Sequence, residues 1–162
     1  ANRGIGILVQ QGAEGDFSRL IVEDNLVAGI LLFQARGALD SVFVTNTLVG
    51  TLLEVDAAPV LDMADGVAVV DSPHLSITSS HVNANERVGL YFSGSSATLE
   101  RVEATRNTVG VQIQDLSTVN YESASNAFLF NTDEDVRVPK DPGEELSGPN
   151  RAADLDGLAP PG

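Results

Sequence analysis

Short apolar runs recur along the chain, each preceded by an asparagine or aspartate, about three residues, and a glycine. The units start at Asn2, Asn25, Asn46, Asp62, Asn85 and Asn107, and a last unit at Asn126 lacks its glycine. Their glycines, which are Gly6, Gly29, Gly50, Gly66, Gly89 and Gly110, lie 23, 21, 16, 23 and 21 residues apart. Periods in the low twenties correspond to one coil of a solenoid.

A second pattern of short strands lies between these units, as in residues 17–22 and 39–44. Each such segment contains two strands that share a bend, so one coil holds three strands. Alternate residues of the first strand should point inward and form stacked ladders. The expected inward set is Ile7, Val9, Ile30, Leu32, Thr51, Leu53, Val67, Val69, Leu90, Phe92, Val111, Ile113, Phe128 and Phe130.

These patterns predict an all-β fold, a right-handed parallel β-helix of about six irregular coils over residues 1–131. No segment keeps a 3.6-residue period long enough for a long amphipathic helix. The 16-residue interval, which contains Pro59, indicates a shortened coil or a local break. We expect the repeated asparagines and glycines to tolerate positive φ and to let coils approach closely. Residues 132–162 are polar and rich in proline, which predicts a C-terminal tail or cap.

The segments NLVAGILLF and NERVGLYFSGSSATLERVEATRNTVGVQIQ resemble the β-helix repeat region of large bacterial exported proteins, a fold class shared with pectate lyases. The resemblance covers roughly residues 1–131 and implies an extracellular or cell-surface protein of a bacterium. It specifies the activity poorly, because this class mixes polysaccharide-degrading enzymes with adhesins. Its lyases use a basic residue near calcium, whereas Lys140 lies in the tail and only Arg36 follows a first strand. β-Elimination on uronic acids is therefore not expected.

The charge of the chain narrows the expected partners. There are 23 acidic and 9 basic residues, for a net charge of −14. Such a surface repels phosphate backbones and anionic head groups, which argues against nucleic acid and acidic membranes. No apolar run reaches the roughly 20 residues that span a bilayer, so membrane insertion is not expected. The absence of cysteine excludes disulfides and thiolate metal sites.

Candidate chemistry is sparse along the chain. Asp56 and Asp71 are expected at similar points of consecutive coils, where two carboxylates could share acid and base duty, with His74 nearby. The alternative is that acidic turns only keep the surface soluble. No cofactor is expected. Calcium is a weak alternative at residues 133–135 and 154–157, because neither segment has the spacing of an EF-hand loop.

An apolar stripe is expected on the outer side of the first strands, and its strongest members are Leu8, Leu31, Phe33, Leu52 and Tyr91. A continuous stripe of this kind normally marks a covered surface. The cover could be the C-terminal tail, a second copy of the chain or another domain.

Three functions are compatible with the sequence. The first is a non-enzymatic extracellular module, a rigid solenoid that contacts protein or glycan and belongs to a larger protein. The second is a polysaccharide hydrolase or lyase, or its remnant, with Asp56, Asp71 and His74 as its residues. The third is end-to-end self-association through uncapped coil ends, because an open coil exposes unpaired backbone.

Overall fold

The computed structural model describes residues 4–52, 61–114 and 116–138. This part of the chain contains strands and no helix, and it therefore has no helix that could span a membrane. The strands are β1 (Ile5–Gln10), β2 (Glu14–Glu23), β3 (Ala28–Phe33), β4 (Arg36–Thr45), β5 (Gly50–Leu52), β6 (Leu61–Met63), β7 (Asp65–Val70), β8 (His74–Thr78), β9 (His81–Asn83), β10 (Val88–Ser93), β11 (Ser96–Glu100), β12 (Glu103–Thr105), β13 (Val109–Gln114), β14 (Thr118–Asn120), β15 (Ala127–Leu129) and β16 (Glu134–Arg137).

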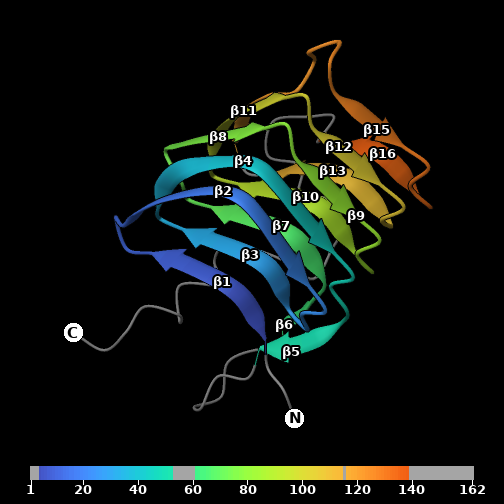
Figure 1. Ribbon diagram of the computed structural model, residues 1–162, viewed down its shortest axis with the longest axis horizontal. Helices are drawn as coiled ribbons and strands as arrows, with labels where there is room; N and C mark the ends of the chain where they lie inside the picture. The colour runs from blue at the N-terminus through green and yellow to red at the C-terminus, as the bar shows by residue number, and fades with distance from the viewer. Residues whose placement is uncertain (1–3, 53–60, 115, 139–162) are drawn as a thin grey trace.

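Two parallel sheets wrap around one core. Sheet A has six strands in the order β1-β3-β7-β10-β13-β16, and sheet B has eight, in which β2 and β4 are long, bent strands. Successive turns stack from β1 to β16 (Figure 1). Six rungs in sheet A delimit five turns of the solenoid. The predicted fold class, an all-β parallel β-helix, is confirmed.

The register along sheet A places equivalent apolar residues above one another. Ile30 pairs with Val67, Val67 with Leu90, and Leu90 with Val111. The inward residues of β3, β7, β10 and β13 belong to one hydrophobic core with the inner side of sheet B. The predicted aliphatic ladders are therefore present on these four rungs.

Each turn bends at corners where one residue has a positive φ, and most of these residues are not glycine. At the corner before sheet A they are Asp24, Asn46, Ala84, Arg106 and Phe130, with φ between 55° and 61°. The repeated glycines of sheet A do not have positive φ in this structure. Of the repeated asparagines, Asn46 does have a positive φ of 57°, but the sheet A glycines do not use one, and their role is close approach.

Gly89 shows why a side chain cannot be accommodated at the repeated glycines. A Cβ there would lie 2.6 Å from Asn107 Nδ2 and 2.7 Å from the carbonyl oxygen of Gly110. In the same way a Cβ on Gly66 would lie 2.7 Å from Asn85 Nδ2. Gly6, Gly66, Gly89 and Gly110 each make room for the asparagine amide of the following turn, whereas Gly29 faces Val44 and Thr47. The recurrent Asn and Gly are thus one packing unit that spans two turns.

The predicted coil at Asn46 is absent, because the chain leaves the solenoid there. β3 pairs directly with β7, and among the described strands β5 pairs with β6 alone, in a separate antiparallel sheet. Gly29 and Gly66 therefore bound a single turn of 66 − 29 = 37 residues with an excursion inside it. Thr51 and Leu52 lie in β5 and not on a rung of sheet A. Leu53 and Pro59 lie outside the described residues.

The last predicted unit, at Asn126, was also assigned to the wrong sheet. Phe128 lies in β15 of sheet B, and Phe130 occupies a positive-φ corner with 81% of its surface exposed. The last rung of sheet A is β16, which pairs with β13. The solenoid therefore continues to Arg137, inside the range predicted as tail.

Replacing Gly89 with alanine should lower the free energy of unfolding by about 1–3 kcal/mol, because the added methyl group overpacks the contact with Asn107. Urea denaturation followed by circular dichroism measures this loss. Gly4→Ala is the matched control, since a Cβ at Gly4 meets nothing closer than 3.8 Å. Equal stability of the two variants would contradict the packing role of Gly89.

Candidate functional site

Asp71 lies at the corner that follows β7, with φ 49° and an exposed side chain. Its backbone N–H donates to the Ser93 carbonyl oxygen at 2.9 Å. By the register of β3, β7 and β10, the adjacent turns place Gln34 and Gly94 at this corner. Neither is a carboxylate. Asp56, its expected partner, lies outside the described residues, so the carboxylate pair stays a prediction.

His74 is the first residue of β8 and is exposed, and its backbone pairs with that of Arg36 in β4. Its position three residues after Asp71 puts it just beyond the same corner. No group of three or more His, Cys, Asp or Glu side chains gathers as metal ligands within the described ranges. The catalytic hypothesis therefore rests on Asp71 and His74 alone in this part of the structure.

The carboxylates at residues 133–135, the weak calcium candidate, are engaged by protein groups. Arg137 forms ion pairs with Asp133 and Glu134. Asp135 Oδ1 accepts a hydrogen bond of 2.8 Å from Asn131 Nδ2. The other calcium candidate, at residues 154–157, lies outside the described residues.

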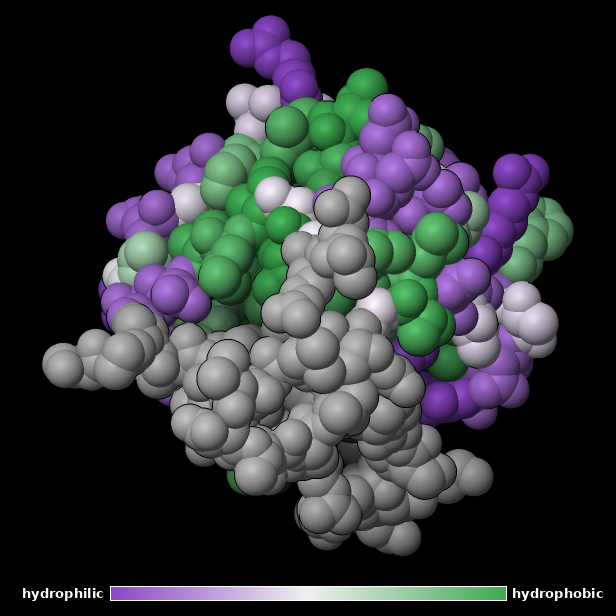
Figure 2. Space-filling view, turned by 90° about the horizontal axis from the view of Figure 1, so that it is seen from below, coloured by the Kyte–Doolittle hydropathy of each residue, from purple (hydrophilic) through white to green (hydrophobic). Residues whose placement is uncertain are grey.

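The predicted apolar stripe is largely buried inside the chain. Leu31, Phe33 and Tyr91 belong to a second hydrophobic cluster on the outer side of sheet A, and all three are almost fully buried. Leu8 is 46% exposed, and Leu52 is in β5, away from this sheet. Viewed from below, hydrophobic residues form a band with hydrophilic residues beside it (Figure 2). Among the four stripe residues whose side chains the structure describes, Leu8 is exposed and the other three are buried.

A buried polar string crosses this apolar layer, and the sequence analysis did not find it. Asp65 is fully buried and forms an ion pair with Arg87, whose guanidinium carbon lies 5.4 Å from the centre of the Tyr91 ring. The Tyr91 hydroxyl donates to Gln114 Oε1 at 2.8 Å. One signal was present in the sequence. The residue just before the repeated glycine is Asp65 in one unit, whereas it is the apolar Val88 in the next unit.

Burial raises the pKa of the Asp65 carboxyl above its ordinary value of 3.8, and the charge of Arg87 opposes that rise. Removing one member of such a buried pair leaves an uncompensated charge, which is costly. The string therefore links the rungs β7, β10 and β13 on a face that is otherwise apolar. These contacts hold three neighbouring turns together inside the protein.

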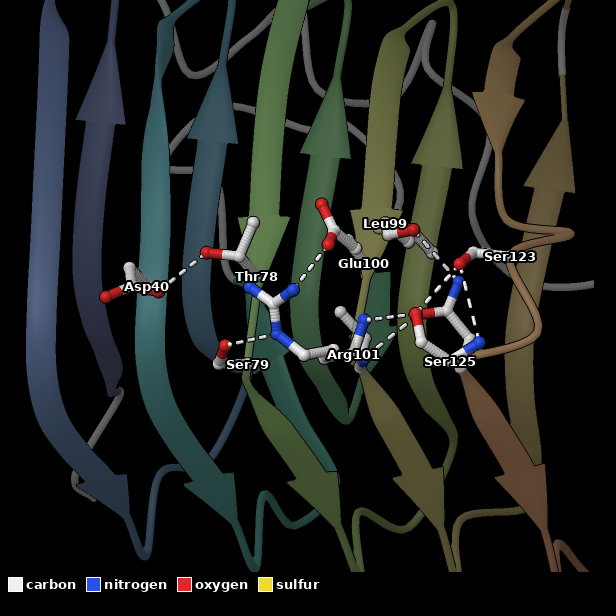
Figure 3. Close-up of polar contacts among 10 residues, drawn as sticks. Asp40, Thr78, Ser79, Leu99, Glu100, Arg101, Ser123 and Ser125 are labelled. Atoms are coloured by element: carbon white, nitrogen blue, oxygen red, sulfur yellow. Dashed lines mark hydrogen bonds and ion pairs between the residues drawn. The ribbon is translucent and has the colours of Figure 1, made fainter.

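The outer face of sheet B, in contrast, is exposed and carries a row of polar side chains. Thr78 Oγ1 donates to Asp40 Oδ1 at 2.7 Å, which connects β4 to β8. Arg101 pairs with Glu100 and its Nε donates to Ser79 Oγ at 3.1 Å. These side chains form a row that runs across the strands, along the axis of the solenoid (Figure 3).

A second row on the same sheet combines apolar and titratable side chains. Ile21, Phe43, His81 and Glu103 follow one another in register on β2, β4, β9 and β12. Ile21 is 66% and Phe43 36% exposed, and the rings of Phe43 and His81 have centroids 6.3 Å apart. His81 Nδ1 lies 3.0 Å from Glu103 Oε2. We call these four residues the Phe43 row.

No family model, no curated protein and no solved structure matches the chain. Function therefore has to be argued from the surfaces themselves. The described structure offers one outer face that is buried within the chain and one that is exposed, ordered by register and chemically mixed.

Replacing Arg87 with leucine removes the guanidinium that forms the ion pair with the buried Asp65 carboxyl. We expect the free energy of unfolding to fall by about 3–5 kcal/mol near neutral pH. A raised folded-state pKa means that the unfolded state loses its proton first as pH rises, so this cost grows above pH 3.8 and is relieved in acid. Urea denaturation near pH 4 and near pH 7 measures both effects.

The matched control is the double variant Asp65→Asn/Arg87→Leu, which removes the titrating group. The stability difference between it and Arg87→Leu should be large near pH 7 and small near pH 4. A difference that does not change with pH would contradict the role assigned to the pair.

Proposed function

We propose that this chain is a non-enzymatic structural and binding module, a rigid parallel β-helix that presents the outer face of sheet B to an extracellular partner. The observation that carries this proposal is the contrast between the two outer faces. The cluster on sheet A is buried within the chain, whereas the Phe43 row is exposed. Parallel pairing fixes the strands of this face about 4.8 Å apart, so its side chains form a regular array.

The side chains of the Phe43 row favour a protein partner. Ile21 and Phe43 form an apolar patch at the β2 edge of sheet B, and polar side chains lie beside it, namely His81 and Glu103 in the same row and Asp40, Thr78 and Glu100 in the neighbouring one. Protein interfaces have this anatomy, with an apolar core and a polar rim. Because the chain has a net charge of −14, a partner with basic residues at its rim would be attracted most strongly.

A glycan partner is the alternative within the same function. Polar rows such as Asp40–Thr78–Glu100 could hydrogen-bond to sugar hydroxyls. Stacking of sugar rings calls for well-exposed aromatic faces, whereas the Phe43 row supplies one phenylalanine ring at 36% exposure. The protein partner is therefore the better supported of the two.

The enzymatic alternative, a polysaccharide hydrolase or lyase, depends on Asp71 and His74. It predicts that the purified chain releases new reducing or unsaturated sugar ends from a polysaccharide and that Asp71→Asn stops the release. We expect no release from a panel of neutral and acidic polysaccharides. Turnover that is lost in Asp71→Asn would establish the enzyme and refute the proposed non-enzymatic function.

A phage-displayed library of random peptides tests where the binding surface lies. We expect enriched peptides to combine apolar side chains with lysine or arginine. Their binding should fall at least about tenfold for the double variant Ile21→Ser/Phe43→Ser, since loss of central apolar contacts costs more than 1 kcal/mol. Biolayer interferometry with the synthetic peptides measures the change.

The control for this experiment is Leu129→Ser, which removes another exposed apolar side chain of sheet B. It should leave peptide binding unchanged, and circular dichroism should show that all variants are folded. Peptides that bind the double variant as well as the wild type would contradict the assignment of the surface. Retardation in polyacrylamide gels containing a soluble polysaccharide, lost in the double variant, would establish the glycan alternative instead.

A further inference from the structure

The last rung of sheet A differs from the others at the glycine position. Val109 pairs with Glu134 and Val111 with Val136, so Asp135 is the residue opposite Gly110. The five preceding rungs all carry glycine there, namely Gly6, Gly29, Gly66, Gly89 and Gly110. Asp135 is thus the one replacement along the six rungs of the described sheet.

Asn85, Asn107 and Asn131, the asparagines at the corner before sheet A, form a hydrogen-bonded ladder. A rung needs glycine at this position when the turn that follows it carries such an asparagine. A Cβ on Gly110 would lie 2.6 Å from Asn131 Nδ2, and a Cβ on Gly89 would lie 2.6 Å from Asn107 Nδ2. Asp135 has a Cβ at the equivalent place. A turn of the same repeat that followed β16 would therefore bring its asparagine amide into this Cβ.

The Asp135 carboxylate also completes the asparagine ladder. Asn85 donates from its backbone N and its Nδ2 to Asn107 Oδ1, at 3.0 and 2.9 Å. Asn107 donates in the same way to Asn131 Oδ1, at 3.0 and 3.2 Å. Asn131 donates from both nitrogens to Asp135 Oδ1, at 3.3 and 2.8 Å. One carboxylate oxygen therefore stands where the next asparagine oxygen would be.

We propose that Asp135 is a stop residue, which closes the C-terminal edge of the solenoid to a further coil of the same repeat, including one from a second copy of the chain. An ionised carboxylate only accepts hydrogen bonds, so it ends the ladder without a further donor to be satisfied. Open edges of parallel sheets promote association, and solenoids need a terminal unit that prevents it. Asp135 supplies this function from within the last rung.

This inference goes beyond the proposed binding function and concerns a different surface. It argues against end-to-end assembly through β14, β15 and β16, the third function considered from the sequence. The Phe43 row lies on the side of the solenoid and is unaffected by it. A negative result for Asp135 therefore does not affect the proposed binding function of sheet B, and a negative result for the Phe43 row does not affect the role of Asp135.

Three substitutions of Asp135 separate its two roles. Asp135→Asn keeps both the acceptor oxygen and the Cβ, Asp135→Ala keeps only the Cβ, and Asp135→Gly removes both. In sedimentation velocity we expect the wild type, Asp135→Asn and Asp135→Ala to be monomers at every concentration. Asp135→Gly should associate with increasing concentration, because its edge again offers the glycine position to an incoming coil.

Hydrogen exchange at the Asn131 backbone amide measures the acceptor role. Loss of the acceptor should accelerate this exchange by roughly tenfold or more in Asp135→Ala and leave it nearly unchanged in Asp135→Asn. Unchanged exchange in Asp135→Ala would overturn the acceptor role. The proposal that Asp135 blocks a further coil would be refuted by either of two results. One is association of the wild type with protection of the β14–β16 amides, and the other is an Asp135→Gly variant that remains a monomer.

Gly110→Ala keeps the proposal testable if Asp135→Gly fails to fold. This substitution introduces a Cβ one rung earlier, where the following turn is present. We expect it to displace the last turn, with faster exchange over residues 127–137 and little change in β3, β7 and their neighbours. Exchange over residues 127–137 equal to that of the wild type would refute the steric part of the proposal.

Discussion

The structure depends on the contact between an asparagine amide and the glycine of the preceding turn. Asn85 and Asn107 are almost fully buried at the corner before sheet A, where each hydrogen-bonds to the next ladder residue. Asn107 Nδ2 also donates to the Val82 carbonyl oxygen at 3.1 Å, which connects the ladder to sheet B. A buried amide must satisfy its hydrogen bonds, and these turns satisfy it with one another. The requirement fixes the spacing and register of the turns, and with them every row of side chains on the outer faces.

Three residues deviate from this repeat, namely Thr47, Asp65 and Asp135. Thr47 takes the place of a ladder asparagine, and its backbone N donates to Asn85 Oδ1 at 3.0 Å, just before the chain leaves for β5 and β6. Asp65 interrupts an apolar position and pairs with Arg87 inside the second hydrophobic cluster. Asp135 replaces the last glycine. The regular part of the solenoid holds these residues in place, and the exposed side of sheet B is the surface that it leaves for contact.

The sequence was sufficient for the fold because its strongest signal, the Asn and Gly period, is the packing unit itself. The predicted turn at Asn46 was wrong, because Asn46 and Gly50 have the spacing of the unit without its packing. The assignment of Phe128 to a rung of sheet A was also wrong. Local spacing cannot distinguish a ladder asparagine from one at a positive-φ corner. The Phe43 row could not be found either, since Ile21, Phe43 and His81 are 22 and 38 residues apart and become neighbours only through the register. Asp56, which lies outside the described residues, remains a prediction.

The free energy of unfolding of Asn107→Ala tests the central role of the ladder most directly. Alanine removes the acceptor for Asn85 and the donor to Val82 and Asn131, so we expect a loss of about 2–4 kcal/mol in urea denaturation. Asn120→Ala, on the exposed outer side of β14, is the matched control and should change the free energy by less than about 0.5 kcal/mol. A loss for Asn107→Ala no larger than that for Asn120→Ala would contradict the account.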